Sequence, residues 1–86
     1  MKGMIFVDPI LGQIQLFPFQ WNMVGWMPCE GQVLQIVQNQ ALFALLGNIY
    51  GGDGRTTFAI PNLKGSEPNP ATKYYIATQG IFPQRD

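Results

Sequence analysis

The chain has 86 residues, the size of one small domain, which leaves no room for separate catalytic and cofactor-binding domains. Five Lys and Arg balance five Asp and Glu, and this zero net charge argues against a basic nucleic-acid surface or a polybasic membrane patch. No His is present, so the commonest general acid–base group and metal ligand is missing. One cysteine, Cys29, excludes an internal disulfide and a Cys-pair zinc site. We therefore expect neither metal nor cofactor.

Hydrophobic residues make up 47% of the chain and charged residues only 12%, about half the charged share of ordinary soluble domains. A small, neutral and charge-poor surface tends to associate. We expect the domain to form a homo-oligomer or to complete its core against a larger partner. The alternative is a monomer with a surface rich in Gln, Asn and Thr.

The first residues do not predict a targeting signal. Lys2 is followed by Asp8 and Gly12, which interrupt the chain before an apolar run of signal length forms. Residues 9–29 carry no charge but contain glutamines and prolines, so they do not predict a membrane span. We expect a chain made in the cytosol without a signal peptide, with Cys29 as a reduced thiol.

The N-terminal half predicts three short strands. Ile10–Phe17 alternates as a half-buried strand, with Ile14 and Leu16 on one side, and Pro18 ends it. Residues 20–25 predict a loop that contains Trp21. A second strand begins at Trp26.

A two-residue turn at Glu30–Gly31, with positive φ at Gly31, returns the chain into a third strand over Gln32–Ile36. One helix is predicted over Gln38–Leu46, with Asn39 capping its first amides and Gly47 in the left-handed position after its end. Its apolar stripe consists of three leucines at helical spacing, Leu42, Leu45 and Leu46.

The remaining chain predicts a glycine-rich turn over Gly51–Arg55, a strand over Thr56–Ile60, a loop over Gly65–Ala71 and a last strand over Tyr74–Thr78. The fold class is therefore α+β, with short β-strands and one short helix. The predicted core consists of the larger apolar side chains on these elements: Trp26, Leu42, Leu45, Leu46, Tyr50 and Phe58.

The glycine-rich turn permits two interpretations. Successive backbone N–H groups in Gly51, Gly52, Asp53 and Gly54 can form an anion-binding nest, with Arg55 neutralising a phosphate. Asp53 repels anions, however, and no Gly-Lys-Ser/Thr ending follows, so a P-loop is excluded. We favour a structural turn in which Asp53 accepts hydrogen bonds from its own backbone.

Catalytic groups are sparse. Glu30 and Asp53 are the one plausible carboxylate pair for hydrolysis, and Glu30 occupies a predicted turn. Cys29 has no His to activate it, so a buried structural thiol is the default. We expect no catalytic residues and no enzymatic activity.

Aromatic residues supply the candidates for binding. They are Trp21, Trp26, Tyr50, Tyr74 and Tyr75. Aromatic faces near Asn and Gln suit neutral glycans, but the same rings serve as core and subunit-interface anchors. The sequence leaves both interpretations open, and we favour core or interface. Exposed aromatics of the Trp21 loop or the Tyr74 strand are the expected subunit contacts.

Four runs of the sequence carry a family resemblance. They are Gly12–Ile14, with Gly-Gln-Ile; Gly25–Gln32, with Gly-Trp-Met-Pro-Cys-Glu-Gly; Gln38–Gly47, ending in Leu-Leu-Gly; and Tyr50–Gly65, with Tyr-Gly-Gly-Asp-Gly-Arg followed by Phe-Ala-Ile-Pro-Asn-Leu-Lys-Gly. From Leu11 to Gly65 the chain resembles the phage tail collar domain. Its ending, Tyr75–Pro83, is similar to that of small members labelled microcystin-dependent-protein-like. The departures are mild: Glu30 for Asp or Asn, Asn62 for Asp, Lys64 for Arg, and Pro28 before the cysteine.

The resemblance implies a compact, non-enzymatic module of tail-fibre and collar proteins, commonly trimeric, carried in the virion tail after synthesis in the host cytoplasm. It divides the chain into an N-terminal extension over 1–10, a collar domain over 11–65 and a C-terminal loop, strand and tail over 66–86. The expected partners are further copies of the chain and other tail proteins. Two alternatives are kept: a stand-alone binding module for a glycan, small ligand or host-defence component, and a hydrolase that uses Glu30 and Asp53.

Overall fold

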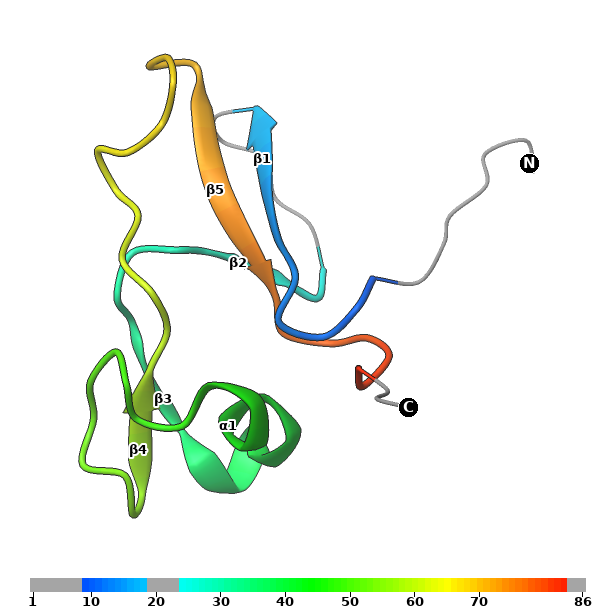
Figure 1. Ribbon diagram of the computed structural model, residues 1–86, viewed down its shortest axis with the longest axis vertical. Helices are drawn as coiled ribbons and strands as arrows, with labels where there is room; N and C mark the ends of the chain where they lie inside the picture. The colour runs from blue at the N-terminus through cyan, green and yellow to red at the C-terminus, as the bar shows by residue number, and fades with distance from the viewer. Residues whose placement is uncertain (1–8, 19–23, 84–86) are drawn as a thin grey trace.

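The structure is a computed structural model that describes residues 9–18 and 24–83. In chain order its elements are β1 (Ile14–Pro18), β2 (Trp26–Pro28), β3 (Val33–Gln35), the 3₁₀ helix η1 (Ile36–Gln38), α1 (Gln40–Leu46), β4 (Thr57–Ala59) and β5 (Thr72–Ala77). Figure 1 shows two small sheets, one carrying α1 beside it and the other formed by strands from both ends of the chain. The α+β prediction is confirmed.

The larger sheet is antiparallel, with strand order β1-β5-β2, so the strand from the C-terminal segment is its centre. Leu16 lies opposite Tyr74 in β5, and Met27 lies opposite Ile76. Pro18 and Pro28 lie in the two edge strands, where a missing N–H costs no inner hydrogen bond of the sheet.

The first strand begins later than predicted. Leu11 and Gly12 form a turn, with the Gln13 N–H donating to the Ile10 carbonyl at 2.9 Å, and β1 starts only at Ile14. Ile14 and Leu16 do share a face, but both are exposed. The reason is that β1 is an edge strand, so fewer neighbours cover its side chains.

The smaller sheet pairs β3 with β4 in an antiparallel register in which Leu34 faces Phe58. The expected return at Glu30–Gly31 is therefore wrong as a hairpin, because β2 pairs with β5 and β3 with β4. Residues 29–31 instead run beside 61–63: the Gly31 N–H donates to the Pro61 carbonyl at 3.3 Å. The predicted positive φ at Gly31 is confirmed at 78°.

The helix is shorter than predicted, because residues 36–38 form η1 and the strand before it ends at Gln35. Asn39 precedes α1 but does not cap it with its side chain. Its side-chain amide instead donates to the Gln35 carbonyl at 2.9 Å. This hydrogen bond joins the residue after η1 to the residue before it. Gly47 has φ 61°, and its N–H donates to the Phe43 carbonyl at 2.7 Å, as expected for a glycine that ends a helix.

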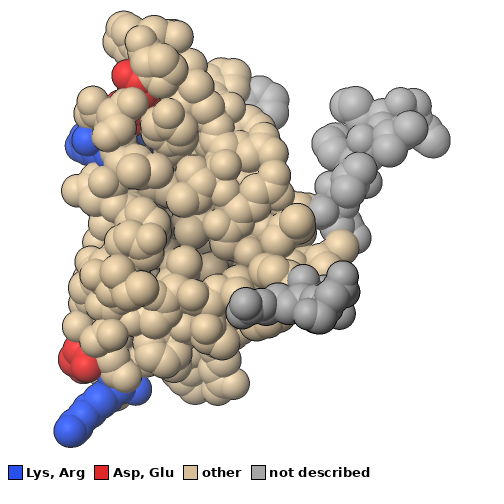
Figure 2. Space-filling view, in the orientation of Figure 1, with Lys and Arg blue, Asp and Glu red and all other residues tan. Residues whose placement is uncertain are grey.

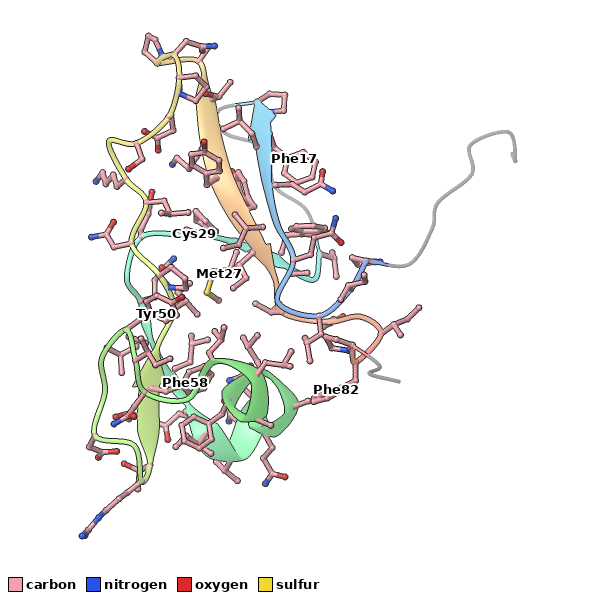
Figure 3. The ribbon with its side chains drawn as sticks, viewed as in Figure 1. Phe17, Met27, Cys29, Tyr50, Phe58 and Phe82 are labelled. Carbon is pink, nitrogen blue, oxygen red and sulfur yellow. The ribbon has the colours of Figure 1, made fainter. Side chains whose placement is uncertain are left out.

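The core lies between the two sheets and α1. Its buried members are Leu11, Cys29, Leu42, Phe58, Ile60 and Ile76. Leu45 and Leu46 pack against this cluster, so the leucine stripe is confirmed, and Phe43 contacts Phe58 with ring centroids 5.3 Å apart. Figure 3 shows Met27, Cys29 and Phe58 turned toward this interior.

Two predicted core residues lie outside this cluster. Tyr50 is 49% exposed, because the turn after α1 joins the fold through its backbone, with the Gly51 carbonyl accepting from the Ala59 N–H at 3.1 Å. Trp26 is half-buried on the other face of the larger sheet, opposite Ala77 in the register. The prediction of a core position is wrong for Tyr50 and incomplete for Trp26.

Candidate functional site

The glycine-rich turn closes around one carboxylate. Oδ1 of Asp53 accepts the backbone N–H groups of Arg55, Thr56 and Thr57 at 2.7, 2.8 and 3.0 Å. Oδ2 accepts the Thr56 hydroxyl at 2.9 Å. These bonds hold the pKa of Asp53 well below its ordinary value of 3.8, since each favours the charged carboxylate. The predicted structural turn is confirmed.

The hydrogen bonds within this turn leave little room for the anion-binding nest that the sequence suggested. Three of the N–H groups that would hold a phosphate already have acceptors: Gly51 donates to the Asn48 carbonyl, Asp53 to Oγ1 of Thr57 and Gly54 to the Thr57 carbonyl. The ion pair found among residues 9–18 and 24–83 joins Lys73 to Glu30, and Asp53 forms none with Arg55 there. Arg55 is exposed and lines a shallow pocket of about 250 Å³, together with Gln35 and Gln40.

Three glycines of this turn have positive φ: Gly51 at 136°, Gly52 at 86° and Gly54 at 76°. Gly52 is the position with the least space. A Cβ there would lie 2.4 Å from Cα of Phe58 and 2.7 Å from the Thr57 carbonyl oxygen. The turn therefore packs backbone against the outer edge of β4, which only a glycine at this position permits.

Glu30 and Asp53, the candidate hydrolytic pair, have separate partners. Oε2 of Glu30 lies 3.1 Å from Nζ of Lys73, so the linker after β2 is joined to β5. Asp53 is engaged by its own turn. Cys29 is 2% exposed, and burial raises the pKa of its thiol to about 11, which leaves it protonated at neutral pH. The default assignment of Cys29 as a buried thiol is confirmed.

The candidate aromatics divide between the two faces of the larger sheet. Phe17, which sequence reasoning missed, contacts Trp26 and Tyr75 edge-on, with centroids 5.2 and 5.8 Å apart. Tyr74 points to the opposite face of the larger sheet and packs against the core. Tyr50 lies in the turn after α1, beside the smaller sheet (Figure 3). Trp21 lies outside the described residues. Alternation already placed Phe17 on the side away from Leu16, but only the pairing of β1 with β5 reveals its neighbours.

A pocket of about 420 Å³ opens beside this cluster, between the start of β2 and the chain after β5. Its lining residues are all uncharged: Pro9, Val24, Gly25, Trp26, Gln79, Gly80 and Ile81. Backbone bonds fix its frame, because the Thr78 N–H donates to the Gly25 carbonyl at 2.8 Å and the Ile81 N–H to the Pro9 carbonyl at 2.9 Å. Gln79 was not among the predicted site residues, although it lies in the family-like ending Tyr75–Pro83.

The surface carries many exposed apolar side chains and few charges. Ten large hydrophobic residues are exposed in the described part of the chain, Val33, Val37, Ile49 and Tyr50 among them. Figure 2 shows the charged side chains gathered in an upper and a lower group along one margin, with the described surface beyond them uncharged. The low charge predicted from composition is thus also unevenly distributed.

Within residues 9–18 and 24–83, no three His, Cys, Asp or Glu side chains form a group that could hold a metal ion. The helices of the described ranges are all too short or too polar to cross a bilayer.

In the described part of the chain, two sheets, the helix α1 and a glycine turn centred on a carboxylate make up a small α+β domain. The chain belongs to the phage tail collar domain family, whose model, described as Phage Tail Collar Domain, matches residues 12–68, more than half of the 86. The match includes α1 and the glycine turn and ends before β5. The resemblance seen in the sequence is confirmed, and the chain carries a phage tail structural module. No curated protein and no solved structure matches it.

Proposed function

We propose that this protein is a non-enzymatic structural component of a phage tail or tail-like particle, in which copies of the collar domain associate with one another and with other tail proteins. The proposal rests on one observation: a collar-family domain exposes large apolar side chains on an almost uncharged surface. A small surface that is poor in charge and exposes apolar side chains favours association between chains. After synthesis in the host cytoplasm, the protein resides in the virion tail.

Two apolar patches support a specific mode of association. The edge patch consists of Val33 in β3 and Val37 in η1, which are 60% and 70% exposed. The turn patch consists of Ile49 and Tyr50, in the turn after α1.

The two patches flank opposite sides of the smaller sheet. β3 pairs with β4 on one side, and the far side of β4 is covered by the glycine turn through the bonds Ala59 N–H to Gly51 carbonyl and Gly54 N–H to Thr57 carbonyl.

Two different patches on opposite flanks favour a head-to-tail contact, in which the edge patch of one copy covers the turn patch of the next. Such contacts close into rings when the rotation between copies allows it, whereas a two-fold dimer needs the same patch on both subunits. We propose a trimeric ring, the number of copies that the family resemblance implies.

The experiment measures molar mass in solution by light scattering coupled to size-exclusion chromatography. The wild-type chain is expected to run as a trimer at high micromolar concentration. Val33→Lys and Tyr50→Lys each place a charge in the contact and are expected to give monomers. Ser66→Lys adds the same charge on an exposed loop outside both patches and is expected to leave the trimer intact.

Mixing the two variants tests the head-to-tail geometry. A Val33→Lys chain keeps its turn patch and a Tyr50→Lys chain keeps its edge patch, so an equimolar mixture is expected to give heterodimers that cannot close a ring. A mixture that stays monomeric contradicts the head-to-tail contact. A wild-type chain that stays monomeric contradicts self-association, and a Val33→Lys chain that remains trimeric removes the edge patch from the contact.

A further inference from the structure

The pocket of about 420 Å³ beside Trp26 lies away from both assembly patches. Its volume falls within the range of about 300–1,000 Å³ found for small-molecule sites. Its walls come from three separate parts of the chain, around Pro9, Gly25 and Gly80, which backbone hydrogen bonds hold together. The site is therefore built into the fold and does not depend on one loop.

Close backbone packing shapes this pocket. A Cβ on Gly80 would lie 2.3 Å from the Pro9 carbonyl oxygen, so only glycine allows these two segments to approach. Gly25 has φ 85°, and its open side is covered by the Gln79 side chain, whose Oε1 would lie 3.5 Å from a Cβ placed there. Gln79 is thus held at the pocket wall next to the residue that precedes Trp26.

The pocket offers an aromatic ring and two side-chain groups that can form hydrogen bonds. The Trp26 ring is steadied by its edge-on contact with Phe17. Neither the Trp26 indole N–H nor the Gln79 amide has a hydrogen-bond partner among the described residues. An amide supplies two donors and one acceptor, so it can bond two adjacent hydroxyl groups at once.

We propose that this pocket binds a neutral sugar ring, with the apolar face of the pyranose against Trp26 and its hydroxyl groups on the Gln79 amide. A pyranose has an apolar face of C–H groups and a polar rim, which matches a wall made of one indole and one amide. All seven lining residues are uncharged, so a phosphate or carboxylate would find no counter-charge and would lose its hydration. Sugar binding is a property of the single domain and does not rest on the proposed assembly.

The experiment follows the backbone amides of the full ¹⁵N-labelled chain by NMR during titration with glucose, galactose or N-acetylglucosamine up to about 50 mM. At least one of these sugars is expected to bind with a Kd of about 1–10 mM, as a single ring over one indole allows. Its shifts are expected at the pocket amides, among them those of Val24, Trp26 and Ile81. Glucuronate, the charged counterpart of glucose, is expected to bind more weakly than glucose.

Gln79→Ala is expected to raise the Kd about fivefold or more, because it removes the amide from an exposed side chain without touching the core. Gln40→Ala removes the same amide from an exposed position on α1 and is expected to leave the Kd unchanged. Trp26→Phe keeps a ring against Phe17 and is expected to weaken binding, while its spectrum reports whether the fold is retained.

Three outcomes would overturn the proposal: no shifts at the pocket amides with any of the three sugars, shifts that Gln79→Ala leaves unchanged, or tighter binding of glucuronate than of glucose. Gln79→Ala is also expected to leave the molar mass in solution unchanged. Loss of sugar binding with an intact trimer, or binding by a monomer, therefore separates the fate of this proposal from that of the assembly.

Discussion

Asp53 and Thr57 hold each other in a reciprocal pair of hydrogen bonds. The Thr57 N–H donates to Oδ1 of Asp53 at 3.0 Å, and the Asp53 N–H donates to Oγ1 of Thr57 at 3.1 Å. The bond from the Asp53 N–H to Oγ1 of Thr57 joins the glycine turn to the first residue of β4. This pairing explains why an exposed carboxylate fixes the turn that protects the outer edge of β4.

Asp53→Ala is expected to lower the Tm by several degrees, because three backbone N–H groups and the Thr56 hydroxyl lose their acceptor together. Thermal unfolding followed by circular dichroism measures the change. Thr56→Val removes only the hydroxyl bond to Oδ2 and serves as the matched control with a smaller fall. Equal changes in the two variants would contradict a turn centred on Oδ1.

Acid is expected to weaken the fold through the same carboxylate. The folded-state pKa of Asp53 is lowered, so its contribution to stability is fully present above the unfolded-state pKa of about 3.9 and is lost as the pH falls below it. Urea unfolding of the wild type and Asp53→Asn between pH 7 and 3 measures this. The advantage of the wild type should be constant above about pH 5 and shrink toward pH 3. A constant difference over the whole range would show that Asp53 is not the group responsible.

Gly52→Ala is expected to be far more damaging than Gly65→Ala, although both glycines have positive φ, at 86° and 94°. A Cβ at Gly65 meets nothing within 4 Å, so that change costs only the left-handed conformation, about 1–2 kcal/mol. A Cβ at Gly52 meets Phe58 backbone at 2.4 Å, so the free energy of unfolding should fall by a further 2 kcal/mol or more, on the order of the largest single-residue effects. Urea titration of both variants measures it, and similar costs would contradict the close packing at Gly52.

Local features of the fold could be predicted from the sequence. Spacing alone located the leucine stripe of α1, and the run Gly51–Arg55 predicted a turn around Asp53, because both depend on neighbours within a few residues. Pairing between distant strands could not be predicted. Alternation assigns Leu16 to a face but not to its partner Tyr74, which lies 58 residues further along the chain. The Glu30–Gly31 hairpin failed for this reason: the positive φ of Gly31 was right, but Glu30 pairs with Asn62 and no hairpin turn forms there.

The candidate pocket was harder to foresee than the fold. Trp26 was a candidate from residue type alone, but Gln79 is one of several glutamines and gains its position only because the Thr78 N–H donates to the Gly25 carbonyl. Tyr50 shows the opposite error, because its apolar ring predicted burial while the backbone of its turn makes the contact. In both cases the deciding interaction is a main-chain hydrogen bond between distant segments, which leaves no side-chain pattern in the sequence.

Alkaline pH is expected to weaken the fold through Cys29. Its folded-state pKa is raised from 9.0 to about 11, so its contribution is fully present below about pH 9 and is lost as the pH rises through 11, a change of about 3 kcal/mol. Cys29→Ala removes the thiol and should therefore unfold with a weaker pH dependence between 9 and 11. Urea unfolding of both chains across this range measures the difference in the free energy of unfolding. The native thiol should also react slowly with a thiol reagent at pH 8 and rapidly in urea, because Cys29 is 2% exposed. Rapid reaction of the folded chain would place the sulfur at the surface and remove the cause of the raised pKa.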